Sequence, residues 1–244
     1  MPKCSLTRFS VRMTDMTEIV LASNNKKKIA ELQYLFDRAD MGDVKILSLR
    51  DIGYTDDIEE NGRSFEENSL IKAYVPASLG YIGIADDSGL CVDALGGEPG
   101  IYSARYSEDE GEADDRDAAN RVKLLRKLES TADADRGGAF VCVMSAVFPE
   151  KSGISVPESY RADVSYASFA GVDNSRAVTV RGECRGVITR EEKGEGGFGY
   201  DNLFYSPELE KTFAEATGDE KNSVSHRGRA VGQFVKVLSD IIGK

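Results

Sequence analysis

Short apolar runs alternate along the chain with segments in which apolar residues recur at helical spacing. A short run is typical of a strand, and recurrence at i, i+3, i+4 and i+7 is typical of a helix with one buried face. Strands that alternate with helices predict an α/β fold. The predicted strands are residues 18–22, 44–49, 81–85, 139–148 and 177–188, and the predicted helical faces are Ile29, Leu32, Leu35 and Phe36; Leu70, Ala73, Tyr74 and Ala77; Val122, Leu125 and Leu128; and Val231, Phe234, Val235, Leu238 and Ile241.

Local signals mark where several of these elements begin and end. Ser64 and Glu67 match an S-x-x-E capping box, and the helix that it opens is expected to stop at Gly80. The run at 139–148 lacks polar alternation, which predicts a strand covered on both faces. No repeat or convincing linker interrupts the pattern. The expected organisation is a disordered N-terminal extension over 1–16, one domain over 17–244 and, within it, a polar surface insertion near 149–176.

The composition narrows the classes of function. Of the 244 residues 41% are hydrophobic, which is enough for a packed core, and 31 basic against 42 acidic residues give a net charge of −11. So acidic a chain repels nucleic-acid backbones, and its longest apolar run is about half of what a membrane-spanning helix needs. We therefore expect neither nucleic acid nor a membrane as a partner. The four scattered cysteines favour the reducing cytoplasm.

Several kinds of catalytic site are excluded. His226 is the one histidine, so a multi-histidine zinc site cannot form, and Ser225 beside it is not on a G-x-S-x-G elbow. There is no G-x-x-x-x-G-K-S/T loop. Residues 194–199 match G-x-G-x-x-G, but they follow a charged segment and precede residues without helical spacing, so a Rossmann cofactor site is not expected. Carboxylates and lysines remain as candidates for the chemistry.

Two adjacent carboxylates follow the predicted strand at 81–85. Open α/β sheets bind ligands just beyond the carboxyl ends of strands, which is where Asp86 and Asp87 are expected. Two such neighbours repel each other unless a proton or a cation intervenes, and Mg²⁺ prefers a few carboxylates with substrate phosphate oxygens. By themselves these residues fit a strand-end turn that is capped by its own side chains at least as well as they fit a metal site.

Two further polar segments could bind a nucleotide. Residues 23–28 join the first predicted strand to the first helix, where backbone N–H groups and a lysine form a natural phosphate site. Lys221 and residues 225–227, before the last helix, offer donors to a planar ligand. In most sequences an N-cap followed by a solvated basic turn would account for the first segment, and a polar loop for the second.

Six motifs follow one another between residues 19 and 234. They are Ser23, Asn25 and Lys28 in S-x-N-x-x-K; Glu60 to Asn68 followed by Lys72; Asp86 to Leu90; Ala94 to Arg105; Gly197 to Asp201; and Lys221 with Ser225, His226 and Arg227. Each motif is weak alone, but six in this order make chance agreement negligible. Together they resemble the inosine triphosphate pyrophosphatase family, which acts on non-standard purine nucleoside triphosphates.

The resemblance implies an enzyme that hydrolyses ITP, dITP and XTP to the monophosphate and pyrophosphate with Mg²⁺, and so cleanses the nucleotide pool. It implies Glu60 and Asp87 as the Mg²⁺ ligands, with Asp87 also taking a proton from the attacking water. Arg227 would be directed at the 6-keto oxygen of the base. The implied substrate-binding residues are Ser23, Asn25, Lys28 and Lys72 for the triphosphate, Ser88, and Phe198, Gly199, Tyr200, Asp201, Lys221, His226 and Arg227 for the base and sugar.

The resemblance also implies an elongated mixed central β-sheet flanked by helices, with two lobes around an active-site cleft, and a homodimer. One departure is Asn202, where proline would be expected, and the substitution should loosen that turn. Two alternatives stay open. A septum-inhibitor-like pyrophosphatase would act on modified pyrimidine or 7-methylguanosine triphosphates, but residues 198–201 and 225–227 argue against it. A non-catalytic nucleotide-binding regulator would not need the intact Glu60, Asp87 and Lys28.

Overall fold

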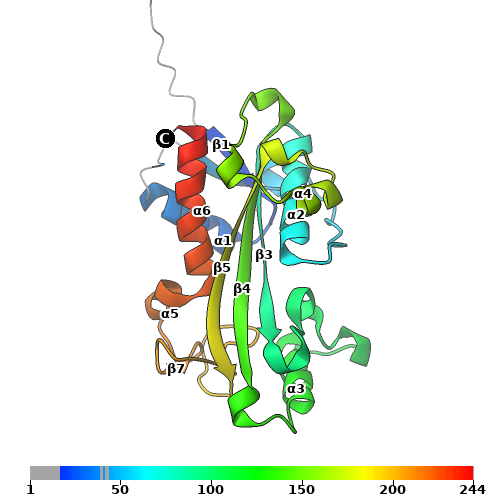
Figure 1. Cartoon of the computed structure of the whole chain (residues 1–244), viewed down its shortest axis with the longest axis vertical. Coiled ribbons are helices and arrows are strands. Elements are labelled where there is room, and N and C mark those ends of the chain that lie inside the picture. Colours follow the sequence, from blue (N-terminus) through cyan, green and yellow to red (C-terminus); the bar gives the residue numbers. More distant parts are fainter. Residues whose placement is uncertain (1–16, 39–40, 42–43, 244) are drawn as a thin grey trace, which may run out of the picture.

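The computed structural model describes residues 17–38, 41 and 44–243. The expected N-terminal extension over 1–16, with Cys4, lies outside the described residues, as does the side chain of Leu35. Figure 1 shows the described chain as an elongated body in which β3, β4 and β5 run through much of the length.

One open sheet of seven strands forms the centre of the described chain, in the order β2-β1-β3-β4-β5-β6-β7. β2 and β3 pair with β1 in parallel, whereas each pairing from β3 to β7 is antiparallel. The α/β fold with a mixed central sheet is therefore confirmed. The strands are β1 (Thr17–Leu21), β2 (Val44–Ser48), β3 (Ile82–Val92), β4 (Gly137–Val147), β5 (Ala177–Ile188), β6 (Phe204–Ser206) and β7 (Lys211–Thr212).

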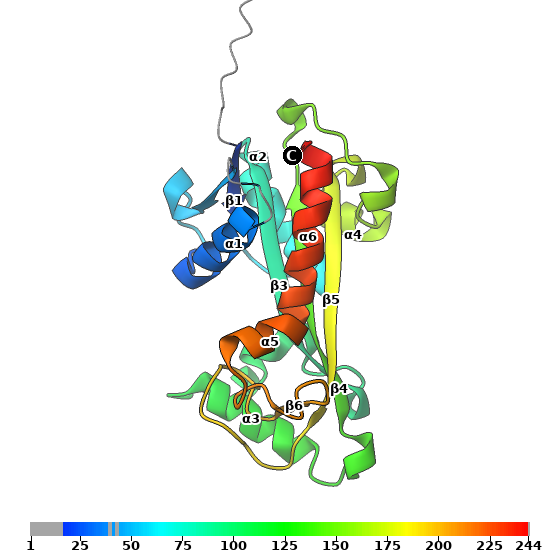
Figure 2. The same ribbon diagram turned by 90° about the vertical axis from the view of Figure 1, so that its left-hand side faces the viewer.

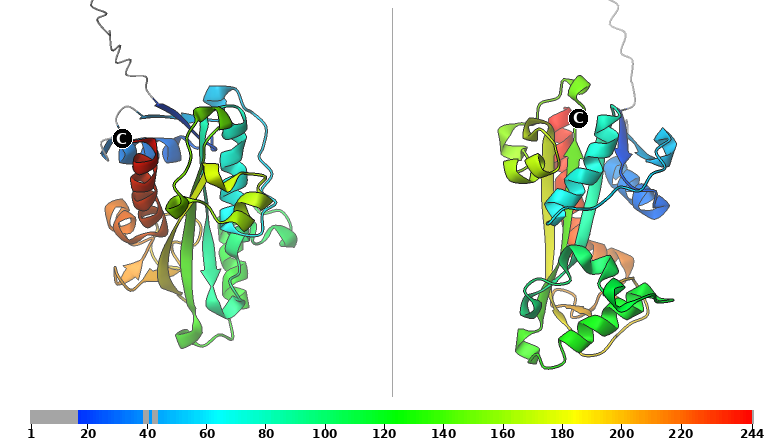
Figure 3. Two further views of the ribbon diagram at one scale, coloured as in Figure 1. Left: turned by 45° about the horizontal axis from the view of Figure 1, so that its top comes forward. Right: turned by 90° about the vertical axis from the view of Figure 1, so that its right-hand side faces the viewer.

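Helices cover both faces of this sheet. Helices α1 and α6 pack on one face (Figure 2), and α2 and α4 pack on the other (Figure 3). Helices α3 and α5 belong to the lower part of the molecule, near β6 and β7. The helices are α1 (Lys26–Arg38), α2 (Phe65–Ser78), α3 (Arg116–Lys127), α4 (Val164–Phe169), α5 (Gly218–Val224) and α6 (His226–Ile242).

The alternation of side chains along β3 decides which helix each residue meets. Successive residues of a strand point to opposite faces of the sheet. Ile82 and Ile84 pack with α1 and α6 in one apolar cluster, whereas Ala85 packs with Leu70 and Ala73 of α2 in another. The next residues of β3 keep the same alternation, and they carry the candidate site.

Most predicted strands are confirmed, and β3 differs most from its prediction. β5 has the predicted bounds, and β4 is buried from Gly138 onward, as predicted for a strand covered on both faces. The prediction that a strand ends at residue 85 is wrong, because β3 continues to Val92. β4 pairs with β3 from Gly83 to Val92, so the backbone hydrogen bonds are satisfied whatever the polarity of the side chains.

Two local features also differ from the sequence-based expectations. Within 149–176 the chain forms α4 and buries Ala162 and Ala167 in the cluster that contains α2, so this segment is less irregular than its polar composition suggests. On α3, Val122 was expected to face inward but is 60% exposed, whereas Leu124 and Leu128 are fully buried. Residues four apart share a helix face and residues two apart do not, which places Val122 away from the core.

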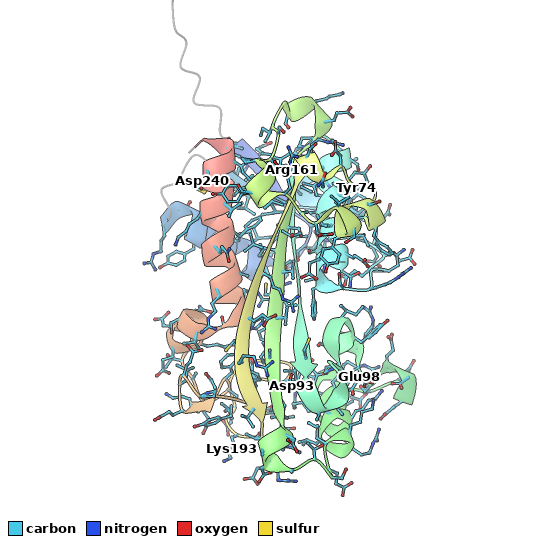
Figure 4. All side chains as sticks on the ribbon, in the orientation of Figure 1. Tyr74, Asp93, Glu98, Arg161, Lys193 and Asp240 are labelled. Atoms are coloured by element: carbon cyan, nitrogen blue, oxygen red, sulfur yellow. The ribbon has the colours of Figure 1, made fainter. Side chains whose placement is uncertain are left out.

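Two lobes share the long strands. The upper lobe contains β1, β2, α1, α2 and α4, and Tyr74, Arg161 and Asp240 lie there, whereas Asp93 and Lys193 lie in the lower lobe with α3 (Figure 4). No helix in the described part of the chain is both long and apolar enough to cross a membrane.

Candidate active site

Asp86 and Asp87 lie in the middle of β3 and point to opposite faces of the sheet. Asp86 meets Lys28 and Arg227 from the α1 and α6 side, and Asp87 meets Lys72 from the α2 side. The expectation that both acids lie past a strand end is therefore wrong, whereas cations do offset their repulsion. Each carboxylate has cations of its own.

The Asp86 carboxylate lies between a lysine and an arginine. Lys28 Nζ is 2.9 Å from Oδ1 and 3.0 Å from Oδ2, and Arg227 Nη2 is 3.2 Å from Oδ2. Burial alone would raise the pKa of Asp86, but the charges of Lys28, Arg227 and Lys72 outweigh burial and hold that pKa well below its usual range. Asp86 is therefore an anion at neutral pH that holds Lys28 and Arg227 against β3.

Asp87 has a different environment. Lys72 Nζ is 3.0 Å from Asp87 Oδ1 and 3.0 Å from Glu60 Oε1, and the Asn68 amide donates to Asp87 Oδ2 at 3.2 Å. Burial raises the pKa of Asp87, the charge of Glu60 adds to this effect, and Lys72 and Asn68 oppose it only in part. Asp87 is therefore the more basic of the two carboxylates on β3.

The loop that carries Glu60 is attached to α2 through a buried asparagine. Asn68 is fully buried, and its Oδ1 accepts a hydrogen bond from the Gly62 N–H at 2.9 Å. A Cβ at Gly62 would lie 2.5 Å from this oxygen, so the close approach requires glycine. Asn68 thus holds both Asp87 and the loop before α2.

The start of α2 uses only half of the predicted capping box. The Ser64 hydroxyl accepts from the Glu67 N–H at 3.1 Å, as predicted. The Glu67 carboxylate, however, accepts from the N–H of Arg63 at 2.6 Å, one residue before the N-cap. The carboxylate still binds backbone at the helix start, so its role differs from that of Glu60.

The loop between β1 and α1 is held by its own side chains. Ser23 Oγ accepts from the Asn25 N–H at 3.1 Å, and Asn25 Oδ1 accepts from the Lys28 N–H at 3.4 Å. These contacts are those of an N-cap, the alternative to a phosphate site that the sequence also offered for residues 23–28. They also direct Lys28 from the first turn of α1 towards β3, so the loop caps the helix and contributes a cation to the site.

The site lies where β1 ends. Among the described residues β1 pairs with β3 only as far as Ile84, and the Ala22 N–H closes the ladder on the Ile84 carbonyl at 2.8 Å. Between Ile84 and the bridge from Cys91 to Pro99, no strand in the described part of the chain pairs with this edge of β3, so Asp86 and Asp87 lie beside an unpaired edge. A pocket on the α1 and α6 face is lined by Leu21, Lys28, Leu32, Asp86, Met144, Arg227 and Val231. The strand whose carboxyl end lies beside the candidate site is thus β1, not β3.

A second cluster lies in the loop before β6 and in α5. Asp201 Oδ2 accepts from the Phe198 N–H at 2.9 Å and from Lys221 Nζ at 2.5 Å. Lys221 Nζ is 4.8 Å from the centre of the Phe198 ring, which is 66% exposed. Tyr200 is buried, and its hydroxyl donates to the Ser103 carbonyl at 2.8 Å. The loop therefore presents one open aromatic face beside a lysine.

His226 is the first residue of α6. In sequence it lies between Lys221 of the second cluster and Arg227, which binds Asp86. Its ring stacks on Phe140 of β4, with centroids 4.8 Å apart and an interplanar angle of 14°. Burial, followed by the charges of Arg227 and Lys221, lowers the pKa of His226 to about 3, so the ring is neutral at pH 7. Its Nδ1 is buried and has no hydrogen-bond partner in the described part of the chain.

The profile of the Ham1 family matches residues 19–237. The chain belongs to the Ham1 family. Its relatives include the dITP/XTP pyrophosphatase of Bacillus cereus, 40% identical over 229 residues, which cover 93% of this chain and 98% of the relative. The dITP/XTP pyrophosphatase of Geobacter sulfurreducens is 39% identical over 229 residues, with the same shares of 93% and 98%.

Solved structures of Ham1 proteins share this architecture. The HAM1 protein of Coxiella burnetii has a TM-score of 0.75 and 36% identity, and the match covers 92% of this chain and 100% of that chain. The Ham1 protein of Staphylococcus aureus has a TM-score of 0.74 and 37% identity, covering 92% and 99%. The expected fold is thus confirmed independently of the site.

Two residues of this Ham1 chain have contacts that the sequence did not predict, although it offered Asp86 as a possible metal or turn carboxylate. Asp86 forms ion pairs with Lys28 and Arg227, and Asn68 joins Asp87 to the loop that carries Glu60. Asn68 lies four residues before Lys72, so a shared helix face was a usable signal. For Asp86 no such signal exists, because its partners lie 58 and 141 residues away.

Glu60 and Asp87 converge on one cation, because the Lys72 ammonium lies 3.0 Å from an oxygen of each. Within the described residues no group of three or more His, Cys, Asp or Glu side chains could hold a metal. Mg²⁺ usually takes one or two carboxylates and completes its octahedron with water and substrate phosphates. The pair therefore fits a Mg²⁺ ion that binds together with a nucleotide.

Proposed function

We propose that this Ham1 protein hydrolyses non-standard purine nucleoside triphosphates (ITP, dITP and XTP) to the monophosphate and pyrophosphate. The observation that carries the proposal is the open edge of β3, where Asp86 and Asp87 hold Lys28, Lys72 and Arg227 on the two faces. A triphosphate brings about four negative charges, which an acidic protein accepts only against such cations. The names of the Bacillus cereus and Geobacter sulfurreducens relatives support the same substrate class.

Ser23, Asn25, Lys28 and Lys72 would bind the triphosphate. Lys28 and Lys72 come from helices on opposite faces of the sheet, and both reach β3. Each is already held by a carboxylate, so little side-chain freedom is lost when a phosphate oxygen becomes a further partner. The backbone N–H groups at the start of α1 would add donors beside Ser23 and Asn25.

Glu60 and Asp87 would hold Mg²⁺, because an oxygen of each already lies 3.0 Å from one cation, the Lys72 ammonium. Bound there, the ion would polarise the phosphate and lower the pKa of a water molecule. Lys72 would then be displaced towards the phosphates. Asp86 would keep its two cations, because its strongly lowered pKa leaves it ionised.

Asp87 would take the proton from the attacking water. In the metal-free protein the pKa of Asp87 is raised and that of Asp86 is lowered, so Asp87 is the better proton acceptor of the two carboxylates on β3. The water oxygen would bond to the α-phosphorus while the bond to the bridging oxygen breaks and pyrophosphate leaves. Asn68 would keep the accepting carboxylate in position through the 3.2 Å hydrogen bond to Oδ2.

The purine would stack on the open face of Phe198, beside Lys221. Stacking accepts any purine, so the choice of base needs a hydrogen-bond donor. Arg227 would read the 6-keto oxygen, which adenine lacks, and neutral His226 would add a polar contact through its buried Nδ1. The remaining members of the proposed pocket are Gly199, Tyr200, Asp201 and Ser88, whose buried hydroxyl has no nitrogen or oxygen partner among the described residues.

A substrate panel tests the proposed function. Pyrophosphate release is measured for ITP, dITP, XTP, ATP and GTP, with Mg²⁺ and with excess chelator. We expect kcat/KM for the first three to exceed that for ATP and GTP by about 10²-fold, and chelator to abolish turnover. Release of orthophosphate, or full activity in chelator, would contradict the proposal. Preference for 7-methyl-GTP or modified pyrimidine triphosphates would support the septum-inhibitor-like alternative, and binding without turnover would support a regulator.

The two acids near the start of α2 should respond differently to loss of charge. Glu60→Gln should raise the Mg²⁺ concentration for half-maximal activity at least about tenfold, because an amide is a weak Mg²⁺ ligand. Glu67→Gln should change it little, because glutamine also accepts the hydrogen bond from Arg63. Magnesium titrations of both variants measure this. Equal loss in the two would place Glu67 in the metal site.

A cytoplasmic homodimer is a further part of the proposal. Cys91, Cys142 and Cys184 are free thiols, which fits a reducing compartment. Burial raises the pKa of all three thiols, so they are poor nucleophiles. Sedimentation equilibrium would measure the assembly.

A further inference from the structure

We propose that Arg121 of α3 is a positioning residue for the purine pocket. Together with Asp117 it holds the main chain of Gly199, between Phe198 and Tyr200, and through Glu192 it also holds Asn202. The inference rests on the proposed function, because it assigns the base-stacking loop a support on another element. The loop formed by residues 192–202 is called the purine loop below.

The two side chains bind both main-chain groups of Gly199. Asp117 Oδ2 accepts from the Gly199 N–H at 2.8 Å, and Arg121 Nη1 donates to the Gly199 carbonyl at 3.0 Å. Asp117 and Arg121 are four residues apart on α3, so they share one face of the helix. Gly199 has φ +60°, a left-handed conformation in which a fixed peptide direction needs outside support.

Arg121 also reaches the two ends of the purine loop. Its Nε donates to Glu192 Oε1 at 3.0 Å, and Glu192 Oε2 accepts from the Asn202 amide. Asn202 is the position at which the sequence departs from an expected proline. The stiffness that a proline ring would supply is here replaced by a hydrogen-bonded chain from Arg121 through Glu192 to Asn202.

Arg121 projects from a packed segment of the lower lobe, and its side chain is mostly buried. Leu124 and Leu128, which follow Arg121 on α3, are fully buried in the core of the lower lobe. The Arg121 side chain is 14% exposed and its hydrogen bond to the Gly199 carbonyl is partly buried, whereas the Glu192 carboxylate is 41% exposed, so the bond to Gly199 is the better shielded of the two. A lysine would be a poor replacement, because the guanidinium reaches the carbonyl through Nη1 and the carboxylate through Nε, two separate donors held in one plane.

The consequence for the reaction is confined to the base end of the substrate. The ring of Phe198 is 66% exposed, so its orientation depends on the backbone that carries it. Within the described part of the chain, the hydrogen bonds of Arg121 end on Gly199 and Glu192, not on Asp87 or on the partners of Lys28 and Lys72. Loss of Arg121 should therefore weaken purine binding and leave phosphate binding and the proton transfer intact.

Steady-state kinetics of Arg121→Ala test this inference, with Arg126→Ala as the control. Arg126 lies on the same helix, but its partner is Glu110 and its side chain is 58% exposed. We expect the KM for ITP to rise about tenfold in Arg121→Ala, as for loss of a hydrogen bond to a charged group, with kcat within about twofold. Inhibition by the product IMP should weaken by a similar factor, whereas inhibition by pyrophosphate should not change. Arg126→Ala should match the wild type in all four.

Glu192→Gln is the second variant, in case Arg121→Ala does not fold. It keeps the side-chain shape and removes the charge that Arg121 binds, so KM and IMP inhibition should shift in the same direction by a smaller factor. A wild-type KM in Arg121→Ala, or an equal loss of IMP and pyrophosphate binding, would overturn the positioning role while leaving the proposed function standing. A wild-type protein that releases pyrophosphate from no purine triphosphate would overturn both.

Discussion

Asp87→Asn is expected to abolish turnover while the protein stays folded. The amide cannot accept a proton from water and cannot neutralise a cation, so kcat should fall by about 10³-fold or more. The folded protein raises the pKa of Asp87, so the folded state binds this proton more tightly than the unfolded state does. Ionisation of Asp87 as the pH rises therefore lowers the free energy of unfolding. Removing this charge should therefore not lower the melting temperature at pH 7 by more than a few degrees.

Asp93→Asn is the matched control for this prediction. Asp93 follows β3 directly and pairs with Arg185 on the surface, where both side chains are more than half exposed. Its loss should change neither turnover nor stability measurably, because exposed ion pairs contribute little. Turnover is measured by pyrophosphate release and stability by calorimetry. An Asp87→Asn variant with kcat within tenfold of the wild type would show that another group takes the proton.

Gly182→Ala is expected to destabilise the protein and impair its activity together. A Cβ at Gly182 of β5 would lie 2.3 Å from the His226 carbonyl oxygen and 2.5 Å from the Ala230 nitrogen, both in the backbone of α6. Backbone cannot move aside as a side chain can, so α6 must shift as a whole. We expect a loss of about 3 kcal/mol in the free energy of unfolding, and a raised KM because α6 carries His226 and Arg227.

Gly232→Ala is the control on the helix itself. A Cβ at Gly232 would meet nothing within 4 Å, and alanine in a helix interior is more stable than glycine by about 0.5–1 kcal/mol. Gly232→Ala should therefore raise the melting temperature, whereas Gly182→Ala should lower it by several degrees, as measured by thermal unfolding. An equal change of the melting temperature in the two variants would mean that the backbone of α6 does not contact β5 closely at Gly182.

The sequence predicts much of the fold because the signals concerned are local. The bounds of β5 and the buried face of α6 follow from apolar periodicity, which the residues of one element express without reference to any other. Errors occurred where the deciding partner was distant. The sequence predicts that the strand before Asp86 and Asp87 ends at residue 85, because its apolar run stops there. The strand continues because its polar residues pair with β4, which is distant in sequence.

The sequence by itself determined which residue types are available for the chemistry, namely carboxylates and lysines with a single histidine, and the order of the motifs that carry them. Only the tertiary structure decided how they are grouped. Asp86 and Asp87 are neighbours in sequence but point to opposite faces of the sheet, because successive side chains of a strand alternate between the faces. Different helices cover the two faces, so the two carboxylates meet different cations. The pairing of β1 with β3 ends at Leu21, so the edge of β3 beside Asp86 and Asp87 is unpaired among the described residues. A contact across 58 or 141 residues has no local signal, and only packing brings such residues together.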